Sequence, residues 1–137
     1  MVKIELSWTE VDTLVSLLSN TIYLSDKNFS GLYGVSDGGK IISILLHRRL
    51  DIPLLNQPQN RCLLVDEAVD SGIRLKKIQD KHTSTVVGGL MYTSALIESE
   101  NSKFSPDFTG RLVGYQDWIV FPWDYSIHAV ENVNNLI

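Results

Sequence analysis

Cysteine, proline and long apolar runs are scarce in this chain of 137 residues. Its one cysteine, Cys62, cannot form a disulfide within the chain, which fits a reducing compartment. The longest apolar run, residues 41–46, is interrupted by Ser43 and is far shorter than the roughly 20 residues of a membrane span. Residues 1–5 lack the apolar core of a signal peptide. We therefore expect a cytoplasmic protein that does not associate with membranes.

Basic charge is also scarce: 12 Lys and Arg face 16 Asp and Glu, for a net charge of −4. Nucleic-acid binding through counterion release is therefore disfavoured. The three histidines, His47, His82 and His128, share no ligand spacing with each other or with Cys62, which argues against structural zinc. A hydrophobic content of 44% at this length predicts a single folded domain over residues 1–137.

The first predicted element is a helix that starts after residue 7. Residues 7–10, Ser-Trp-Thr-Glu, form a capping box with Ser7 as N-cap and Glu10 reaching back to it. Apolar residues then recur at helical spacing and give the helix one buried face. These residues are Val11, Leu14, Val15, Leu18 and Ile22.

Strand and helix signals then alternate along the chain. This alternation predicts an α/β fold with a mostly parallel sheet and helices on both faces. Strands are expected at residues 31–35, 51–55, 62–65, 83–90 and 111–115, with Pro53 marking an edge strand, and helices at 40–50 and 73–80. The polar turns 36–39 and 66–72 each join a strand to a helix. In such folds ligands bind beyond the carboxyl ends of the strands, so these turns are the places to look for chemistry.

The strongest functional signal is residues 63–72, Leu-Leu-Val-Asp-Glu-Ala-Val-Asp-Ser-Gly. An apolar strand delivers two adjacent carboxylates, Asp66 and Glu67, which can hold a pair of ribose hydroxyls or a magnesium-bound sugar phosphate. A third acid, Asp70, follows. Ser71 and Gly72 then open a helix whose first backbone N–H groups can bind a phosphate. Positive charge is added nearby by Arg74, Lys76 and Lys77.

This segment resembles the signature of the type I phosphoribosyltransferases, which is two apolar positions followed by Asp-Asp/Glu-x-x-Asp-Thr-Gly. Residues 33–39, Tyr-Gly-Val-Ser-Asp-Gly-Gly, resemble the pyrophosphate loop of the bacterial xanthine-guanine subgroup. Residues 118–124, Trp-Ile-Val-Phe-Pro-Trp-Asp, resemble the tail of the same subgroup, and residues 7–10 resemble its start. The motifs follow one another in the family's order and spacing, so the resemblance implies its fold.

The resemblance also implies roles for single residues. Asp66 and Glu67 would contact the ribose hydroxyls of phosphoribosyl pyrophosphate, with Mg²⁺ bridging its pyrophosphate and ribose oxygens. Asp70 would lie near the purine as the general base. The other implied contacts are Ser71, Gly72 and Arg74 to the 5′-phosphate, Ser36, Asp37, Gly38 and Gly39 to the pyrophosphate, and Trp118 and Ile119 to the base.

The implied activity is transfer of the 5-phosphoribosyl group to a 6-oxopurine, namely hypoxanthine, guanine or xanthine, with release of pyrophosphate. Members of this family are commonly dimers or tetramers, so a homo-oligomer is expected by analogy.

Four departures from the family pattern support an alternative hypothesis. Asp37 stands where the subgroup carries a cation, and at ~5 Å its charge would repel pyrophosphate by about 3 kcal/mol per charge pair. Arg74 replaces the last hydroxyl of the phosphate loop. Residues 86–97 contain no lysine for the purine oxygen, and residues 56–61 are a shortened form of the family's long hood loop. The alternative is a catalytically impaired protein of this fold that binds nucleotide or phosphate. A third hypothesis is an unrelated flavodoxin-like binding domain, which would mean that the match to the family motifs arose by chance.

Overall fold

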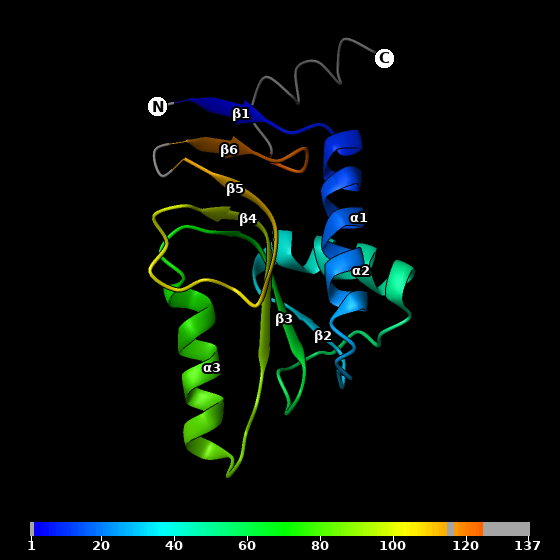
Figure 1. Cartoon of the computed structure of the whole chain (residues 1–137), viewed down its shortest axis with the longest axis vertical. Coiled ribbons are helices and arrows are strands. Elements are labelled where there is room, and N and C mark those ends of the chain that lie inside the picture. Colours follow the sequence, from blue (N-terminus) through cyan, green and yellow to red (C-terminus); the bar gives the residue numbers. More distant parts are fainter. Residues whose placement is uncertain (1, 115–116, 125–137) are drawn as a thin grey trace.

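Parallel strands form the central sheet of the computed structural model, which describes residues 2–114 and 117–124 (Figure 1). The elements in chain order are β1 (Lys3–Glu5), α1 (Trp8–Leu24), β2 (Leu32–Gly34), α2 (Ser36–Leu50), β3 (Leu63–Val69), α3 (Ile73–Thr85), β4 (Tyr92–Ser99), β5 (Phe108–Val113) and β6 (Trp118–Val120). Within the described residues, none of the helices has the length and apolar character needed to cross a membrane.

The order of the strands in the sheet places the expected binding region. The four main strands run β2-β3-β4-β5, and every neighbouring pair is parallel. Outside β2, Leu54 forms an isolated parallel bridge to Leu32, so the expected strand at 51–55 is reduced to one bridge at the sheet edge. The chain thus moves outward from β2 to Leu54 and then returns past β2 to β3. Strand order therefore reverses between β2 and β3, the position at which such sheets bind ligands.

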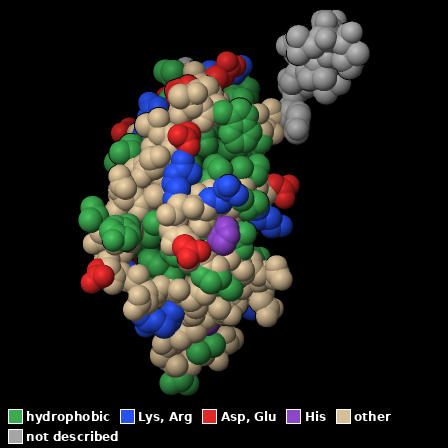
Figure 2. Space-filling view, turned by 90° about the vertical axis from the view of Figure 1, so that its right-hand side faces the viewer, with side chains coloured by type: hydrophobic (Ala, Val, Ile, Leu, Met, Phe, Trp, Pro, Cys, Tyr) green, Lys and Arg blue, Asp and Glu red, His purple; other side chains and the backbone are tan. Residues whose placement is uncertain are grey.

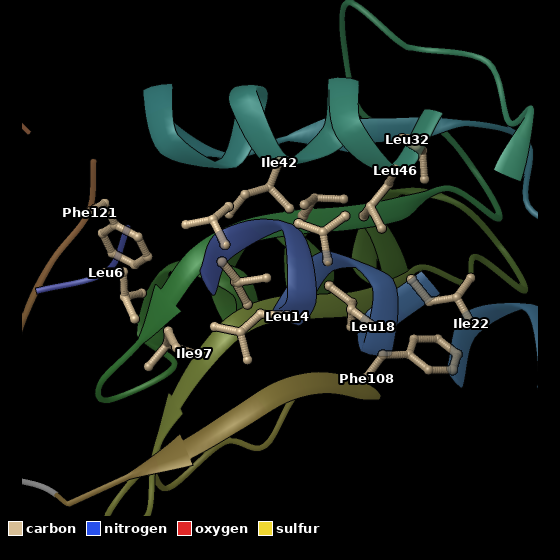
Figure 3. Close-up of a cluster of buried hydrophobic side chains, with 14 of the residues drawn as sticks. Leu6, Leu14, Leu18, Ile22, Leu32, Ile42, Leu46, Ile97, Phe108 and Phe121 are labelled. Carbon is tan, nitrogen blue, oxygen red and sulfur yellow. The ribbon is translucent and has the colours of Figure 1, made fainter. Parts of the chain in front are cut away.

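Helices cover both faces of the sheet, as the alternating pattern predicts. α1 and α2 pack against each other on one face, with α2 over β2 and β3 and α1 over β4 and β5. Figure 3 shows side chains from both helices meeting those of the sheet, including Leu18, Ile42 and Ile97. α3 lies on the opposite face (Figure 1), where its Leu75 packs into a second cluster with Leu64 of β3.

The amino-terminal helix forms as its sequence predicts. Ser7 Oγ accepts a hydrogen bond from the Glu10 backbone N–H at 3.1 Å, and Glu10 Oε1 accepts one from the Ser7 N–H at 3.1 Å. The capping box therefore supplies partners for two N–H groups that have none within the helix. All five apolar residues at helical spacing are buried.

The strand expected at residues 83–90 is wrong. Thr83 to Thr85 form the last turn of α3, and the next strand, β4, begins at Tyr92. The Thr83 and Thr85 hydroxyls donate to backbone carbonyls three and four residues earlier, which lets threonine remain in a helix. Gly88 then turns the chain with φ of 68°. The high β-propensity of threonine and valine predicts a strand in this segment, but the preceding helix continues into it.

Other boundaries differ by a few residues. α2 begins at Ser36, so the expected turn 36–39 is its first helical turn. β3 continues to Val69, so the adjacent acids lie within the strand instead of after it. β4 and β5 extend into the polar stretch of residues 98–110, for which the sequence pattern predicts no strand. Of the strand expected at 111–115, residue 115 lies outside the described residues.

A small second sheet joins the two ends of the described chain. β1 pairs in parallel with β6, with Lys3 opposite Trp118 and Glu5 opposite Val120. Neither strand was expected, because each has only three residues. The surface over α1 and α2 mixes hydrophobic, basic and acidic side chains (Figure 2).

Candidate functional site

The two adjacent acids lie in the carboxyl half of β3, beside the start of α2. Asp66 is buried, with 2% of its surface exposed, and its Oδ1 accepts hydrogen bonds from the Glu67 N–H at 2.8 Å and the Ser36 hydroxyl at 3.2 Å. Arg74 Nη1 lies 3.6 Å from the same oxygen. One oxygen of Asp66 is thus engaged from three sides, and the elements α2, β3 and α3 meet at this carboxylate.

Burial dominates the electrostatics of both acids. It raises the pKa of Asp66 above its ordinary value, although the Glu67 N–H, Arg74 and Ser36 act in the opposite direction. Burial likewise raises the pKa of Glu67. The hydrogen bond from Trp123 opposes that rise, and the nearby carboxylates of Asp124 and Asp66 add to it. Carboxyl groups with perturbed pKa values are found preferentially at functional sites.

Glu67 connects the strand to the aromatic tail. Its Oε2 accepts a hydrogen bond from the Trp123 indole Nε1–H at 2.8 Å. On its other side it lies against Gly38 in the first turn of α2, where an added Cβ would overlap the carboxylate. Sequence reasoning gives no sign of this contact, because a hydrogen bond between side chains 56 residues apart leaves no local pattern.

The paired glycines allow α2 to begin directly against β3. A Cβ at Gly39 would overlap the Val65 carbonyl oxygen, so the helix could not approach so closely with a larger residue. Ser36, which has a positive φ of 70°, accepts a hydrogen bond from the Gly39 N–H at 3.2 Å. Asp37 is exposed in the same turn. Residues 36–39 therefore lie together next to Asp66 and Glu67.

The turn after β3, residues 70–72, leads directly into α3. Gly72 has a φ of 83°, and a Cβ there would lie 2.6 Å from the Cβ of Phe104. Ser71 Oγ accepts a hydrogen bond from the Ile73 N–H at 3.3 Å at the start of α3. A small cavity of about 120 Å³ runs along this loop, from Asp66 to Leu75.

A larger cavity of about 300 Å³ opens beside the loop. Four carboxylates line it: Glu67, Asp70, Asp117 and Asp124. Its apolar lining includes Ile97, Val113, Ile119 and Phe121. Asp70 also lines the small loop cavity and a third one of about 510 Å³ bounded by Lys76, Lys103 and Phe104. Asp70 therefore lines all three of these cavities.

Trp118 and Ile119 lie differently with respect to the cavity. Ile119 lines it, whereas Trp118 is 55% exposed on β6 with the Lys3 Nζ 5.3 Å from its ring centroid. The expected base-stacking role of Trp118 stays a prediction. Among the described aromatic residues, Phe121 is the one that lines this cavity.

Residues 56–61 lie before the first residue of β3, at the end of the sheet away from the acids. The Asn60 Oδ1 accepts a hydrogen bond from the Leu90 N–H at 2.7 Å, and the Arg61 N–H donates to the Leu90 carbonyl at 2.6 Å, just before β4 begins. Asp66 lies three residues beyond Leu63, the first residue of β3, which is about 10 Å further along the strand at ~3.3 Å per residue. This loop therefore does not cover the candidate site.

Asp66 and Glu67 offer carboxylate oxygens, the type of donor that Mg²⁺ prefers. In the part of the chain that the structure describes, His, Cys, Asp and Glu form no group of three or more able to hold a metal alone. Two adjacent carboxylates suit Mg²⁺, which keeps several waters and takes its remaining oxygens from substrate phosphates.

Comparisons with known proteins agree with this architecture. The sequence matches no protein-family model and no curated protein. Its structure is similar to that of a purine phosphoribosyltransferase from Pyrococcus horikoshii Ot3, with 22% identity, a TM-score of 0.76, and coverage of 92% of this chain and 97% of that one. It is also similar to a Helicobacter pylori xanthine-guanine-hypoxanthine phosphoribosyltransferase, at 19% identity and a TM-score of 0.79, covering 97% and 99%.

A third similar structure is described as a hypothetical protein from Neisseria gonorrhoeae with bound ppGpp. It is 19% identical, with a TM-score of 0.76 and coverage of 96% of this chain and 94% of that one. At such low identity these likenesses establish the fold. The chain has an α/β fold of the type I phosphoribosyltransferase kind, with helices on both sides of a parallel sheet, as its motifs predict.

Proposed function

We propose that this protein transfers the 5-phosphoribosyl group of phosphoribosyl pyrophosphate to a 6-oxopurine, releasing pyrophosphate. The observation that carries the proposal is the meeting of three features at one edge of the sheet. These are the acid pair Asp66 and Glu67, the phosphate loop that opens α3, and the cavity beside Asp70.

In this proposal, each part of the donor lies against one of these features. The ribose hydroxyls face Asp66 and Glu67, and the 5′-phosphate lies at the start of α3, near Ser71, Gly72 and Arg74. The pyrophosphate approaches the first turn of α2, and the base enters the cavity next to Ile119. Asp66 and Glu67 would also hold the Mg²⁺ that accompanies the donor. That ion would neutralise charge on the departing pyrophosphate.

The chemistry is a single exchange at the anomeric carbon of ribose. The bond from C1′ to the pyrophosphate oxygen breaks, and the pyrophosphate leaves with that electron pair. The base nitrogen forms the new bond to C1′, and its proton passes to Asp70 as general base. The carboxylate of Asp70 also stabilises the positive charge that develops on the sugar.

Product formation tests this proposal. The protein is incubated with phosphoribosyl pyrophosphate, Mg²⁺ and, separately, hypoxanthine, guanine, xanthine and adenine. Chromatography then detects the nucleoside monophosphate. We expect product with at least one 6-oxopurine and none with adenine. An absence of product with every base would contradict an enzymatic role.

Asp70→Asn tests the assignment of the base. Because asparagine cannot accept the proton, kcat should fall roughly 10²–10⁴-fold, with little change in donor affinity. Asp26→Asn, in the exposed turn after α1, is the matched control and should retain full activity. An unchanged kcat in Asp70→Asn would remove Asp70 from proton transfer.

A second candidate function is nucleotide binding without catalysis. It is favoured by the exposed Asp37 in the first turn of α2 and by a cavity whose described lining has four carboxylates and neither lysine nor arginine. The Neisseria gonorrhoeae structure of the same fold was described with bound ppGpp. Calorimetric titration with phosphoribosyl pyrophosphate, GMP and ppGpp separates the two functions, because tight binding without any product would support the second.

We further propose that the chain works as a homo-oligomer in the cytoplasm. The support is analogy within the fold, together with the single buried Cys62, which suits a reducing compartment. Sedimentation analysis of the purified protein measures the oligomeric state, and a monomer at all concentrations would contradict it.

A further inference from the structure

The surroundings of Glu67 point to a residue outside the motif that controls this acid. Its Oε2 lies between the Trp123 indole, at 2.8 Å, and the backbone of Gly38. An indole nitrogen can only donate a hydrogen bond, so this contact requires an oxygen opposite it. Among the residues that the structure describes, none donates to the other oxygen, Oε1.

Trp123 is itself held in place by neighbours. Its ring stacks on Phe121 with centroids 4.8 Å apart and planes at 9°, and it tilts against Trp8 of α1 at 5.7 Å. The turn beneath it is closed by Asp124, whose Oδ2 accepts a hydrogen bond from the Phe121 N–H at 2.8 Å. The indole N–H therefore has a fixed direction, and it can impose that direction on the carboxylate.

Glu67 is also the acid of the adjacent pair that lines the 300 Å³ cavity. Without a fixed partner, rotation about the last side-chain bond would exchange its two oxygens freely. With Oε2 held by Trp123, Oε1 is the oxygen left for a ligand. The tail after β6 thus reaches the sugar-binding acids through one hydrogen bond.

We propose, on the basis of the proposed function, that Trp123 is a positioning residue. Its indole N–H orients the Glu67 carboxylate so that Oε1 meets a ribose hydroxyl of the donor. Trp123 acts through Glu67 and does not itself contact the reacting atoms.

The test is the affinity for phosphoribosyl pyrophosphate with Mg²⁺, measured by calorimetry and so independent of turnover. Trp123→Phe keeps an aromatic ring against Phe121 and removes the N–H. We expect it to bind the donor about tenfold more weakly, the loss of one hydrogen bond to a charged group. Tyr23→Phe, which also removes a polar hydrogen from an aromatic side chain but at a position of α1 that is 76% exposed, should bind like the wild type.

A second pair of variants separates positioning from a structural effect. If Trp123 acts through Glu67, the Trp123→Phe change should cause no further loss of affinity in a Glu67→Ala background. If Trp123→Phe loses the same affinity in the wild-type and Glu67→Ala backgrounds, the positioning role is overturned. The role is also overturned if Trp123→Phe alone binds the donor as tightly as the wild type. Failure of the wild-type protein to bind the donor at all would instead overturn the proposed function, and this inference with it.

Discussion

A buried acid is the unusual residue of this site. Asp66 lies at 2% exposure, held by the Glu67 N–H and the Ser36 hydroxyl, and partly balanced by Arg74 at 3.6 Å. A raised pKa in the folded state means that the ionised carboxylate is less stable there than in the unfolded chain. Asp66 therefore reduces stability at neutral pH, a cost that fits a role in binding.

The pH dependence of stability follows with a definite sign. The folded protein holds the Asp66 proton more tightly, so the free energy of unfolding falls as pH rises from the ordinary value of 3.8 through the raised pKa. Asp66→Asn keeps an acceptor for the same donors but cannot ionise. The free energy of unfolding of the variant minus that of the wild type should therefore be larger at about pH 7 than at about pH 3. Urea unfolding at both pH values measures this, and a pH-independent difference would contradict it.

At the scale of elements, the turn that opens α3 depends on one backbone conformation. Gly72 starts α3 with a φ of 83° and lies so close to Phe104 that no side chain fits. A larger residue would carry both the strain of a left-handed backbone and a collision. The loop and the segment around Phe104 are thus shaped together.

Two glycine substitutions separate strain from crowding. Gly88 also has a positive φ, of 68°, but has no atom within 4 Å of an added Cβ. Gly88→Ala should lower the free energy of unfolding by about 1 kcal/mol, from strain alone. Gly72→Ala adds the collision and should lower it by about 3 kcal/mol. Urea unfolding measures both, and equal losses would show that Phe104 moves aside without cost.

At the scale of the whole molecule, one face of the sheet carries the larger core. Side chains from α1, α2 and the sheet pack into a single cluster that extends to Phe121 in the aromatic tail (Figure 3). The same packing that stabilises the fold therefore fixes the tail beside β3. A loss of core packing should therefore lower the free energy of unfolding and also displace the residues of the site.

Neighbouring leucines in α1 test this. Leu18 is 0% exposed and Leu17 is 52% exposed, with the same chemistry at adjacent positions. Leu18→Ala should lower the free energy of unfolding by about 2–5 kcal/mol, while Leu17→Ala should change it by about 0.5 kcal/mol or less. Thermal and urea unfolding, followed by circular dichroism, measure both. Similar losses in the two variants would contradict this description of the core.

The sequence by itself determined the features that depend on local chemistry. The capping box at Ser7, the apolar face of α1 and the α/β alternation could be predicted because hydrogen bonds and burial repeat at short spacing. The strand that carries Asp66 and Glu67 and the turn that precedes α3 could also be located, because an apolar run followed by polar residues and a glycine is a local signal.

Only the tertiary structure decided which distant groups meet. The hydrogen bond from Trp123 to Glu67, the cavity shared by Asp70 and Ile119, and the place of residues 56–61 at the far end of the sheet all depend on packing between remote segments. Local propensity also failed at Thr83 to Thr85, where the helix continued against it. Contacts across many residues follow from how the helices and strands fill space together, and no local pattern records that.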